Sequence, residues 1–454
     1  MIVSTSPQRP DRVLAEVPAI PPAAVAAAAA RARRAQAEWA PAGPAARAAA
    51  LHAAADAVEG AAAELTALAV AEVGKPRGEA RGEVARTVSI LRYYAQQSFD
   101  PLGASHDAPG DTLTFTTRRP RGVAGLITPW NFPLAIPVWK AAPALAFGNA
   151  VLLKPAEEAT ACALRLGELL GPHLPDGLLA VLPGAAETGQ AVLNCADVVS
   201  FTGSTQVGQS IVAAAAARGV PVQAEMGGQN PAIVLPDADH ATAAATIAAA
   251  VAGYAGQKCT ATKRVIVVGD PAAFTDALVD AIDKLPVGDP DDDATVVGPV
   301  IDAAARSRVL DAASSVAAAG GRTLIGGHAL HDPGWYVTPT VVDSLPADHL
   351  LERDEVFGPI CTVSTVRTLD EAITRANNVR QGLVAGLYTN DLGAVLRATQ
   401  SLAAGMIKIN APTAGVDFYL PFGGVKDSSY GGKEQGKAAL ETFTSTHTIT
   451  MATG

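Results

Sequence analysis

The sequence predicts an α/β fold with two doubly wound parallel-sheet domains and a small antiparallel sheet. From Gly122 onward, short apolar runs alternate with longer helical stretches, a pattern typical of parallel sheets covered by helices. A second series of the same kind starts after Gly256. Two segments outside both series, Thr112–Arg118 and Thr442–Thr450, alternate polar and apolar residues, as strands with one exposed face do. These two could pair in a small separate sheet.

The first hundred residues are predicted to be helical, because they are rich in Ala, Leu, Glu and Arg. The expected helices span Ala23–Ala35, Ala45–Val73 and Glu83–Gln97. The Gly103–Gly110 segment is a loop that leads into the exposed strand Thr112–Arg118.

The strands of the first α/β series are short apolar runs, expected at Val123–Ile127, Ala150–Leu153, Leu179–Leu182, Val198–Phe201 and Ala232–Leu235. The helices between them are expected at Ala135–Ala146, Thr160–Leu170 and Val207–Ala217. The strands of the second series are expected at Arg264–Val268, Val337–Val342, Cys361–Val366, Ala385–Tyr388 and Met406–Ile409.

Composition excludes several classes of protein. The chain has 454 residues, of which 49% are hydrophobic and 17% charged, with a net charge of −10. It can therefore bury large hydrophobic cores. It lacks the net positive charge that is typical of a nucleic-acid-binding protein. Its four cysteines and eight histidines show no disulfide or metal spacing. The N-terminus has no apolar signal core, and the apolar run Ala241–Ala252 is too short for a bilayer. We therefore expect a cytoplasmic protein with neither metal nor membrane contact.

Cys259 is a candidate nucleophile. It lies in the turn Gly-Gln-Lys-Cys-Thr between a helical stretch and a strand, and the adjacent Lys258 favours the reactive thiolate. The alternative is a buried structural cysteine, which is the usual role of an isolated Cys. Local sequence alone leaves both interpretations open.

Two polar residues lie where chemistry can be supported. Glu225 stands between apolar neighbours before two glycines, and burial there would raise its pKa toward that of a general base. Asn131 follows a strand in Thr-Pro-Trp-Asn-Phe-Pro, where a fixed amide can donate to an oxyanion. A turn-capping carboxylate and a turn-forming Asn are the simpler alternatives.

Two strand ends are candidate nucleotide-binding sites. The segment Phe-Thr-Gly-Ser-Thr-Gln-Val-Gly, 201–208, opens a helix with small residues, and the N–H groups of a helix N-terminus suit a pyrophosphate. It is not the G-x-G-x-x-G fingerprint. Lys154 and Glu157, after another strand, are candidate partners for ribose hydroxyls.

Taken together and in this order, the motifs resemble those of the aldehyde dehydrogenase superfamily. Eight of them cover nearly the whole chain: TPWNFP, KPAE, LPG at Leu182–Gly184, FTGSTQVG, EMGG, GQKC, EVFGP at Glu355–Pro359, and PFGGVKDSSYG at Pro421–Gly431. The combined resemblance overrides the simpler interpretation of each single motif. Within the superfamily, the chain looks most like the α-ketoglutaric semialdehyde dehydrogenase branch.

The resemblance implies a covalent mechanism. Cys259 would attack the aldehyde carbon, and Asn131 with the backbone N–H of Cys259 would hold the oxyanion. Hydride transfer to a nicotinamide would leave a thioester, which Glu225 would hydrolyse by activating water. Relatives that use coenzyme A typically lack this glutamate, so its presence implies hydrolytic release.

The resemblance also implies the cofactor site. Lys154 and Glu157 would contact the adenine ribose, Gly203 and Ser204 the pyrophosphate, and Glu355 and Phe357 the nicotinamide ribose and ring. Further cofactor contacts would come from Thr128, Pro129, Trp130, Gly184, Phe201, Val207 and Gly227. Because Glu157 would repel a 2′-phosphate, NAD is favoured, while NADP stays possible.

The implied architecture has three parts. An NAD-binding domain would comprise residues 1–102 and 123–227, a catalytic domain residues 228–428, and an oligomerisation arm residues 103–122 and 429–454. A free strand edge in the arm invites pairing with another subunit, so we expect a homodimer or homotetramer. The N-terminal strand region that the family usually has looks shortened here.

The segment Asn410–Gly436 and the GQKCTATKR motif look most like those of the branch that oxidises α-ketoglutaric semialdehyde, and this resemblance implies a small, carboxylate-bearing semialdehyde as substrate. Lys258 and Arg92 could anchor its anionic group, although either could be a solvated surface charge. Three further tentative substrate contacts are Thr260, Phe132 and Phe418. A phosphonate- or phosphate-bearing aldehyde is the alternative substrate.

A non-enzymatic protein of this fold would be expected to lack the nucleophile, base or oxyanion donor, and all three are present. The sequence gives no account of Asp427, where Gly is common.

Overall fold

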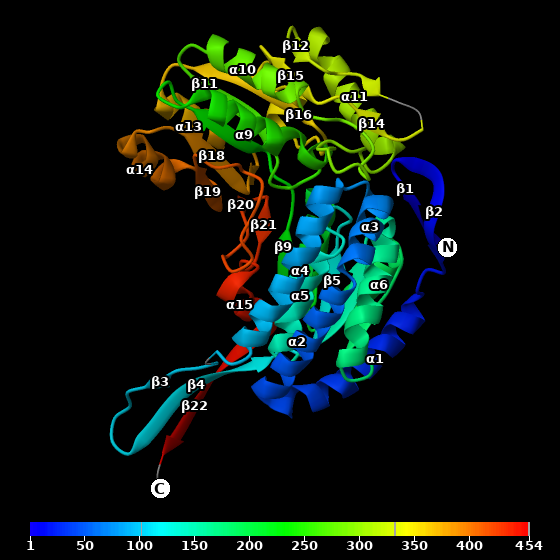
Figure 1. Cartoon of the computed structure of the whole chain (residues 1–454). Helices are drawn as coiled ribbons and strands as arrows, with labels where there is room; N and C mark the ends of the chain where they lie inside the picture. Colours follow the sequence, from blue (N-terminus) through cyan, green and yellow to red (C-terminus); the bar gives the residue numbers. More distant parts are fainter. Residues whose placement is uncertain (101, 331–332, 453–454) are drawn as a thin grey trace.

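The computed structural model describes residues 1–100, 102–330 and 333–452. Figure 1 shows two lobes, one above the other in this view, and a long β arm that projects from the lower one. The lower lobe contains most of the first half of the chain, and the upper lobe contains most of the second half.

The lower lobe is built on a six-stranded sheet in the order β21-β9-β8-β5-β6-β7. Its strands are β5 (Val123–Thr128), β6 (Ala150–Pro155), β7 (Leu179–Val181), β8 (Val198–Thr202), β9 (Val222–Glu225) and β21 (Ser429–Tyr430). All pairs are parallel except β21 with β9. The chain passes from β5 to β6 on one side and later places β8 on the other side of β5. A crevice for a ligand is therefore expected at the carboxyl ends of β5 and β8.

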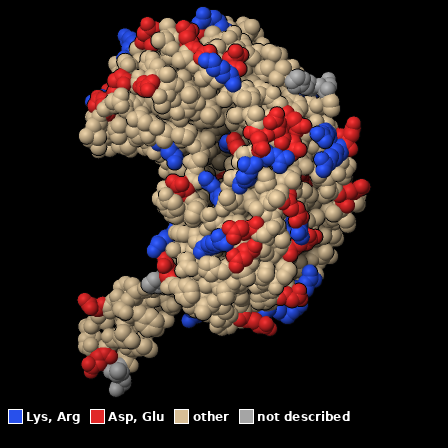
Figure 2. All heavy atoms as spheres, viewed as in Figure 1, with Lys and Arg blue, Asp and Glu red and all other residues tan. Residues whose placement is uncertain are grey.

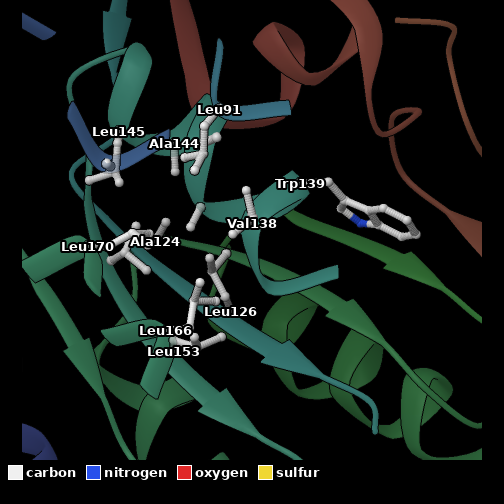
Figure 3. Packing of buried hydrophobic residues seen from close by; sticks show 14 of the residues in the cluster. Leu91, Ala124, Leu126, Val138, Trp139, Ala144, Leu145, Leu153, Leu166 and Leu170 are labelled. Carbon is white, nitrogen blue, oxygen red and sulfur yellow. The ribbon is translucent and has the colours of Figure 1, made fainter. Parts of the chain in front are cut away.

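Helices cover this sheet because their alanines and leucines allow close packing. They are α1 (Pro22–Trp39), α2 (Gly43–Gly60), α3 (Ala62–Val73), α4 (Arg77–Gln97), α5 (Ala135–Ala146), α6 (Thr160–Leu170), α7 (Ala186–Cys195) and α8 (Thr205–Ala217). Figure 3 shows Leu126 of β5 and Leu153 of β6 beside Leu166 of α6. All three side chains are buried, so the sheet and its helices form one core.

The upper lobe contains a seven-stranded sheet in the order β12-β15-β16-β11-β10-β18-β19. Its strands are β10 (Asn230–Val234), β11 (Thr262–Val268), β12 (Arg322–Ile325), β15 (Thr340–Asp343), β16 (Ile360–Val366), β18 (Val384–Tyr388) and β19 (Met406–Ile409). Only the β12 pairing is antiparallel. The covering helices are α9 (His240–Ala252), α10 (Ala272–Asp283), α11 (Ala303–Ala318), α12 (Leu350–Arg353), α13 (Leu369–Asn377) and α14 (Leu392–Ser401).

The arm is a three-stranded antiparallel sheet of β3 (Ser105–His106), β4 (Thr112–Pro120) and β22 (Thr444–Ala452). The predicted pairing of the two alternating segments is confirmed, with Thr444 opposite Pro120 and Ala452 opposite Thr112. The short helix α15 (Ala439–Phe443) leads into β22. Because β22 is at the edge of this sheet, its outer backbone groups are available for another strand.

The structure differs from the sequence prediction at several elements. The polar N-terminus forms a hairpin of β1 (Ile2–Ser6) and β2 (Arg9–Val17), and β9 was also not predicted. Two predicted elements are divided: the helix 45–73 breaks at Ala61 into α2 and α3, and the strand 337–342 breaks into β14 (Tyr336–Val337) and β15. Pro339 lies at the second break and has no N–H to donate to a ladder.

The remaining strands form small pairs, β13 (Ala329–Leu330) with β14 and β17 (Gln381–Gly382) with β20 (Val425–Lys426). The segment 429–454, predicted to belong to the arm, first contributes β21 to the six-stranded sheet. None of the helices in the described ranges has the length and apolar character needed to cross a bilayer. The same ranges contain no group of three His, Cys, Asp or Glu residues placed to hold a metal ion.

Candidate active site

Cys259 lies in a turn that is fixed from both sides. The turn follows residues 254–256, whose φ angles of 55°, 51° and 64° are left-handed, a path that residues with a Cβ rarely take. The Gln257 side chain holds it by accepting a hydrogen bond from the Ile301 N–H at 2.8 Å. On the other side, Asn230 Nδ2 donates to the Cys259 carbonyl at 2.7 Å. The nucleophile candidate therefore has a fixed backbone.

Asn131 reaches this turn from the other lobe. It lies in the loop between β5 and α5, and its side chain is buried. Its Nδ2 donates to the Gln257 carbonyl at 2.9 Å, two residues before Cys259. The structure thus brings the predicted amide donor to the backbone that carries the predicted nucleophile.

Glu225 is the last residue of β9 and is buried. The Ser429 hydroxyl donates to one carboxylate oxygen, and Gln223 Nε2 donates to the other at 2.9 Å. Burial, followed by the charge of Glu434, raises the pKa of Glu225 well above its usual range. The predicted general base is therefore held in one orientation with an elevated proton affinity.

A buried polar network continues behind Glu225. Lys140 Nζ donates to Ser200 Oγ at 2.8 Å and forms an ion pair with Glu434. Ser200 Oγ donates to Gln223 Oε1 at 2.7 Å, and Gln223 in turn donates to Glu225. Burial lowers the pKa of Lys140. The base is thus connected by side chains to a second buried carboxylate and a buried amine.

The expectation that Lys258 favours the Cys259 thiolate is wrong. Burial raises the pKa of the Cys259 thiol, and the charges of Glu355 and Glu225 raise it further. Lys258 instead donates to Glu79 Oε1 at 2.7 Å, so its charge is compensated. Proton removal from the thiol therefore needs a base at the moment of attack.

Cys259 opens into a cavity of about 230 Å³. Figure 2 shows the hollow between the two lobes with Lys and Arg side chains at its rim. The walls of the cavity are formed by Glu79, Gly82, Glu83, Arg86, Phe132, Ile136, Trp139, Lys258, Cys259, Thr260, Gly415, Val416 and Phe422. Three predicted substrate contacts, Phe132, Lys258 and Thr260, are among them.

Two predicted substrate contacts lie elsewhere. Arg92 is on the side of α4 that faces α2, where its guanidinium pairs with Asp56 at 3.0 Å and Glu59 at 2.7 Å. The prediction for Arg92 is corrected because that face of α4 packs toward α2 rather than the cavity. Phe418 packs edge-to-face on Tyr93, with ring centroids 5.7 Å apart, outside the residues that form the cavity wall. The sequence analysis missed Arg86, which is on the cavity side of α4.

The loop that carries Asn131 rests on a buried ion pair. Lys75 and Glu83 pair with side chains that are fully buried. Glu83 Oε1 also accepts the N–H groups of Leu134 and Ala135 at 2.9 Å each, at the start of α5. Lys75 Nζ lies 3.7 Å from the centre of the Phe132 ring. The pair therefore joins α4 to the loop and to α5.

We expect Lys75→Met to lower the free energy of unfolding by about 3–5 kcal/mol, because it leaves Glu83 buried without its counter-charge. Urea unfolding followed by far-ultraviolet circular dichroism measures the change. The matched control is Lys284→Met, which removes an exposed ion pair with Asp280 and should change stability by less than about 0.5 kcal/mol. If both variants had the same free energy of unfolding, the buried ion pair would make no net contribution to stability.

Several of the predicted cofactor residues lie at the carboxyl ends of β5 and β8, where the strand order predicts a ligand crevice. Thr128 ends β5, and its Oγ1 is buried without a hydrogen-bond partner among the described residues. Ser204 precedes α8 in an extended conformation, and its side chain makes no cap bond. The first-turn N–H groups of a helix have no partner inside it. The Gly203 N–H donates to the Glu225 carbonyl at 3.1 Å, so it is not one of the donors open to a phosphate.

Other predicted cofactor residues lie on neighbouring strand ends. Lys154 lies near the end of β6, and Glu157 begins the short helical turn that comes after this strand. Burial lowers the pKa of Lys154, while the charge of Glu157 opposes this effect. The others are found after β7 (Gly184), in β8 (Phe201), beside the β5 end (Pro129) and in the first turn of α8 (Val207).

Glu355 comes from the upper lobe, and its carboxylate lies next to Gly227, which follows β9. Its Oε1 is buried and lacks a hydrogen-bond partner in the described parts of the chain. Burial raises its pKa to about 7 although the charge of Lys263 opposes the rise. A Cβ at Gly227 would collide with the Glu355 carboxylate, so a larger residue there would displace this side chain. The rings of Trp130 and Phe357 meet edge-to-face, with centroids 5.7 Å apart.

Asp427, which the sequence analysis could not interpret, forms an ion pair with Arg380 at 2.7 Å. Its N–H also donates to the Arg380 carbonyl at 3.0 Å. These contacts stabilise the turn between β20 and β21, and that turn leads to Ser429, the hydrogen-bond donor to Glu225.

This geometry agrees with the comparison to known proteins. The model of the aldehyde dehydrogenase family matches residues 1–449. The chain belongs to the aldehyde dehydrogenase family. This membership confirms the resemblance inferred from the eight motifs.

Relatives of the same family share most of their length with the chain. The α-ketoglutaric semialdehyde dehydrogenase of Bacillus subtilis is 39% identical over 409 residues, which are 88% of this chain and 84% of that protein. The α-ketoglutarate semialdehyde dehydrogenase of Haloferax volcanii is 40% identical over 398 residues, 85% of this chain and 82% of that protein.

The crystal structure of an NAD-dependent aldehyde dehydrogenase from Sinorhizobium meliloti superposes with a TM-score of 0.96 at 32% identity. The match covers 99% of this chain and 91% of that one. The predicted fold class is therefore confirmed.

Proposed function

We propose that the protein oxidises a small, carboxylate-bearing aldehyde to the corresponding acid with NAD, through a thioester on Cys259 that water hydrolyses. The observation that carries this proposal is the convergence of three residues from different elements. Cys259 opens into the cavity, Asn131 is bonded to the same turn, and the segment that follows Glu225 lies against the Cys259 carbonyl at Gly228.

In the first step, Cys259 Sγ forms a bond to the aldehyde carbon as the thiol loses its proton. Asn131 Nδ2 and the Cys259 N–H then donate to the oxyanion. Because burial disfavours the free thiolate, the thiol proton passes to a water molecule in the cavity as the C–S bond forms. NAD, when bound, supplies the acceptor for the hydride that leaves the adduct carbon.

In the second step, Glu225 removes a proton from water, and the resulting hydroxide attacks the thioester. The tetrahedral adduct expels Cys259 as thiolate and releases the acid. Proton transfer by a positioned carboxylate is efficient when its pKa lies near the working pH, and burial shifts the pKa of Glu225 in that direction. Glu225 thus favours hydrolysis over transfer to coenzyme A.

The crevice residues fit NAD. Two buried oxygens, Thr128 Oγ1 and Glu355 Oε1, lack partners within the described ranges, and ribose hydroxyls or a carboxamide could bond to them. Lys154 and Glu157 are placed at a strand end for the adenine ribose. A carboxylate at that position disfavours the 2′-phosphate of NADP. The similarity to an NAD-dependent enzyme supports the same assignment.

The substrate class rests on the cavity and on the relatives. A cavity of about 230 Å³ suits a short aldehyde, and two relatives at 39% and 40% identity are named for a semialdehyde that carries a carboxylate. A single unpaired cation in the wall, described below, favours a carboxylate over a doubly charged phosphonate.

A substrate panel tests the proposal. NADH formation is followed with carboxylate-bearing semialdehydes, a phosphonate-bearing aldehyde and neutral aldehydes of equal length, each with NAD and NADP. We expect the highest kcat/KM for a carboxylate-bearing semialdehyde with NAD. Equal kcat/KM for the neutral aldehydes, or preference for the phosphonate, would overturn the substrate class; no activity on any aldehyde would overturn the reaction.

The arm is proposed to serve in assembly of a homodimer or homotetramer, with the three-part domain division described above. β22 is an edge strand, and Leu113 and Met451 on the paired strands are exposed apolar residues that face solvent in the single chain. Light scattering coupled to size exclusion measures the mass; a monomeric mass would contradict this assignment.

A further inference from the structure

Four charged residues line the cavity in front of Cys259, and three of them have a counter-charge. Lys258 and Glu79 neutralise each other at 2.7 Å. Glu83 is paired with Lys75 behind the wall. The fourth charged residue, Arg86, is bonded differently.

Arg86 is on the cavity face of α4. It follows Glu79 and Glu83 by seven and three residues, and residues at this spacing lie on one face of a helix. Its guanidinium donates to the main-chain carbonyl of Val416 in the opposite wall. Burial lowers the pKa of Arg86, while the charges of Asp417 and Glu83 oppose this effect.

A carbonyl carries no charge, so the bond to Val416 leaves the charge of Arg86 uncompensated by direct contact. A guanidinium has five N–H donors in a planar fork, and only some are used by one carbonyl. Such a fork matches the two oxygens of a carboxylate. The cavity therefore presents one desolvated cation together with free donors.

We propose that Arg86 binds the carboxylate at the far end of the aldehyde substrate while the aldehyde carbon lies at Cys259. This proposal rests on the function proposed above and assigns its substrate anchor. It replaces Lys258 and Arg92, the cations named from the sequence, because both are paired with carboxylates.

Part of the cavity wall is apolar. The same cavity is lined by Phe132, Ile136, Trp139 and Phe422 as well as by Cys259 and Arg86, and the methylene groups of a short chain can pack against such side chains. Exclusion of water there strengthens the attraction between a guanidinium and a carboxylate. One cation suits one negative charge, so a phosphonate with two charges would be bound less well.

The experiment compares Arg86→Leu with wild type on a five-carbon semialdehyde bearing a carboxylate and on the neutral aldehyde of the same length. We expect kcat/KM for the carboxylate substrate to fall about 10- to 100-fold, mainly through KM. The rate with the neutral aldehyde should change less than about threefold, which also shows that the variant folds. Arg86→Lys should recover part of the loss, because it restores the charge without the fork.

The matched control is Arg81→Leu on the same helix, where the exposed Arg81 pairs with Asp293; it should leave both kcat/KM values unchanged. If wild type prefers the carboxylate substrate and Arg86→Leu keeps that preference, the Arg86 assignment is overturned while the proposed function stands. If wild type shows no preference for the carboxylate, the substrate class itself fails. An equal loss on both aldehydes would make Arg86 a structural residue and would also overturn the assignment.

Discussion

Replacement of Cys259 by alanine is expected to lower kcat by about 10⁴- to 10⁶-fold, the range seen when an enzyme loses its covalent nucleophile. The variant should still bind NAD, because the crevice at β5 and β8 does not depend on the thiol. The Cys259 backbone is fixed by bonds from Asn230 and the Gln257 region, so removing one sulfur leaves the turn in place. NADH formation measures turnover, and titration calorimetry measures NAD binding.

A second cysteine provides the control for this experiment. Cys195 is a free, partly exposed cysteine at the end of α7, away from the cavity wall. Cys195→Ala should keep kcat within about twofold of wild type. If Cys259→Ala retained comparable turnover, the covalent mechanism would be wrong and the thiol would be a structural group. Loss of both turnover and NAD binding in Cys259→Ala would contradict the independence of the two sites.

Most strands of both sheets could be predicted from local patterns because buried parallel strands are short and apolar. Segments whose structure depends on distant partners could not. The hairpin β1–β2 is polar, and β9 is set by its pairing with β8 and β21. The three main catalytic candidates were found from motifs, since each is placed at an element end that sequence can locate.

The charged residues of the cavity illustrate what could not be predicted from local sequence. Lys258 is paired with Glu79, which is 179 residues away, and no local pattern shows such a partner. The sequence analysis named Arg92 and missed Arg86 because the phase of α4 relative to the cavity depends on tertiary packing. Six residues correspond to about one and two-thirds helical turns, so the two arginines point to different sides.

Glu225→Gln is expected to convert the enzyme into one that forms NADH in a single rapid burst and then turns over slowly. The amide keeps the shape of the carboxylate and can still bond to Ser429 and Gln223, but it cannot take a proton from water. Steady-state turnover should fall about 10²- to 10⁴-fold, with the burst equal to the concentration of active sites. Rapid mixing followed by NADH absorbance resolves the two phases.

The pH dependence of wild type provides an independent measure of the same group. Glu225 acts as base only when ionised, and burial followed by the charge of Glu434 raises its pKa. The hydrolysis rate should therefore rise with pH and be lost as the pH falls through this raised pKa, whereas the slow phase of Glu225→Gln should not show that step. Glu371→Gln, which changes an exposed carboxylate paired with Arg367, should keep the wild-type profile. A Glu225→Gln enzyme with no burst and normal turnover would assign hydrolysis to another base, and the buried Glu434 would be the next residue to replace.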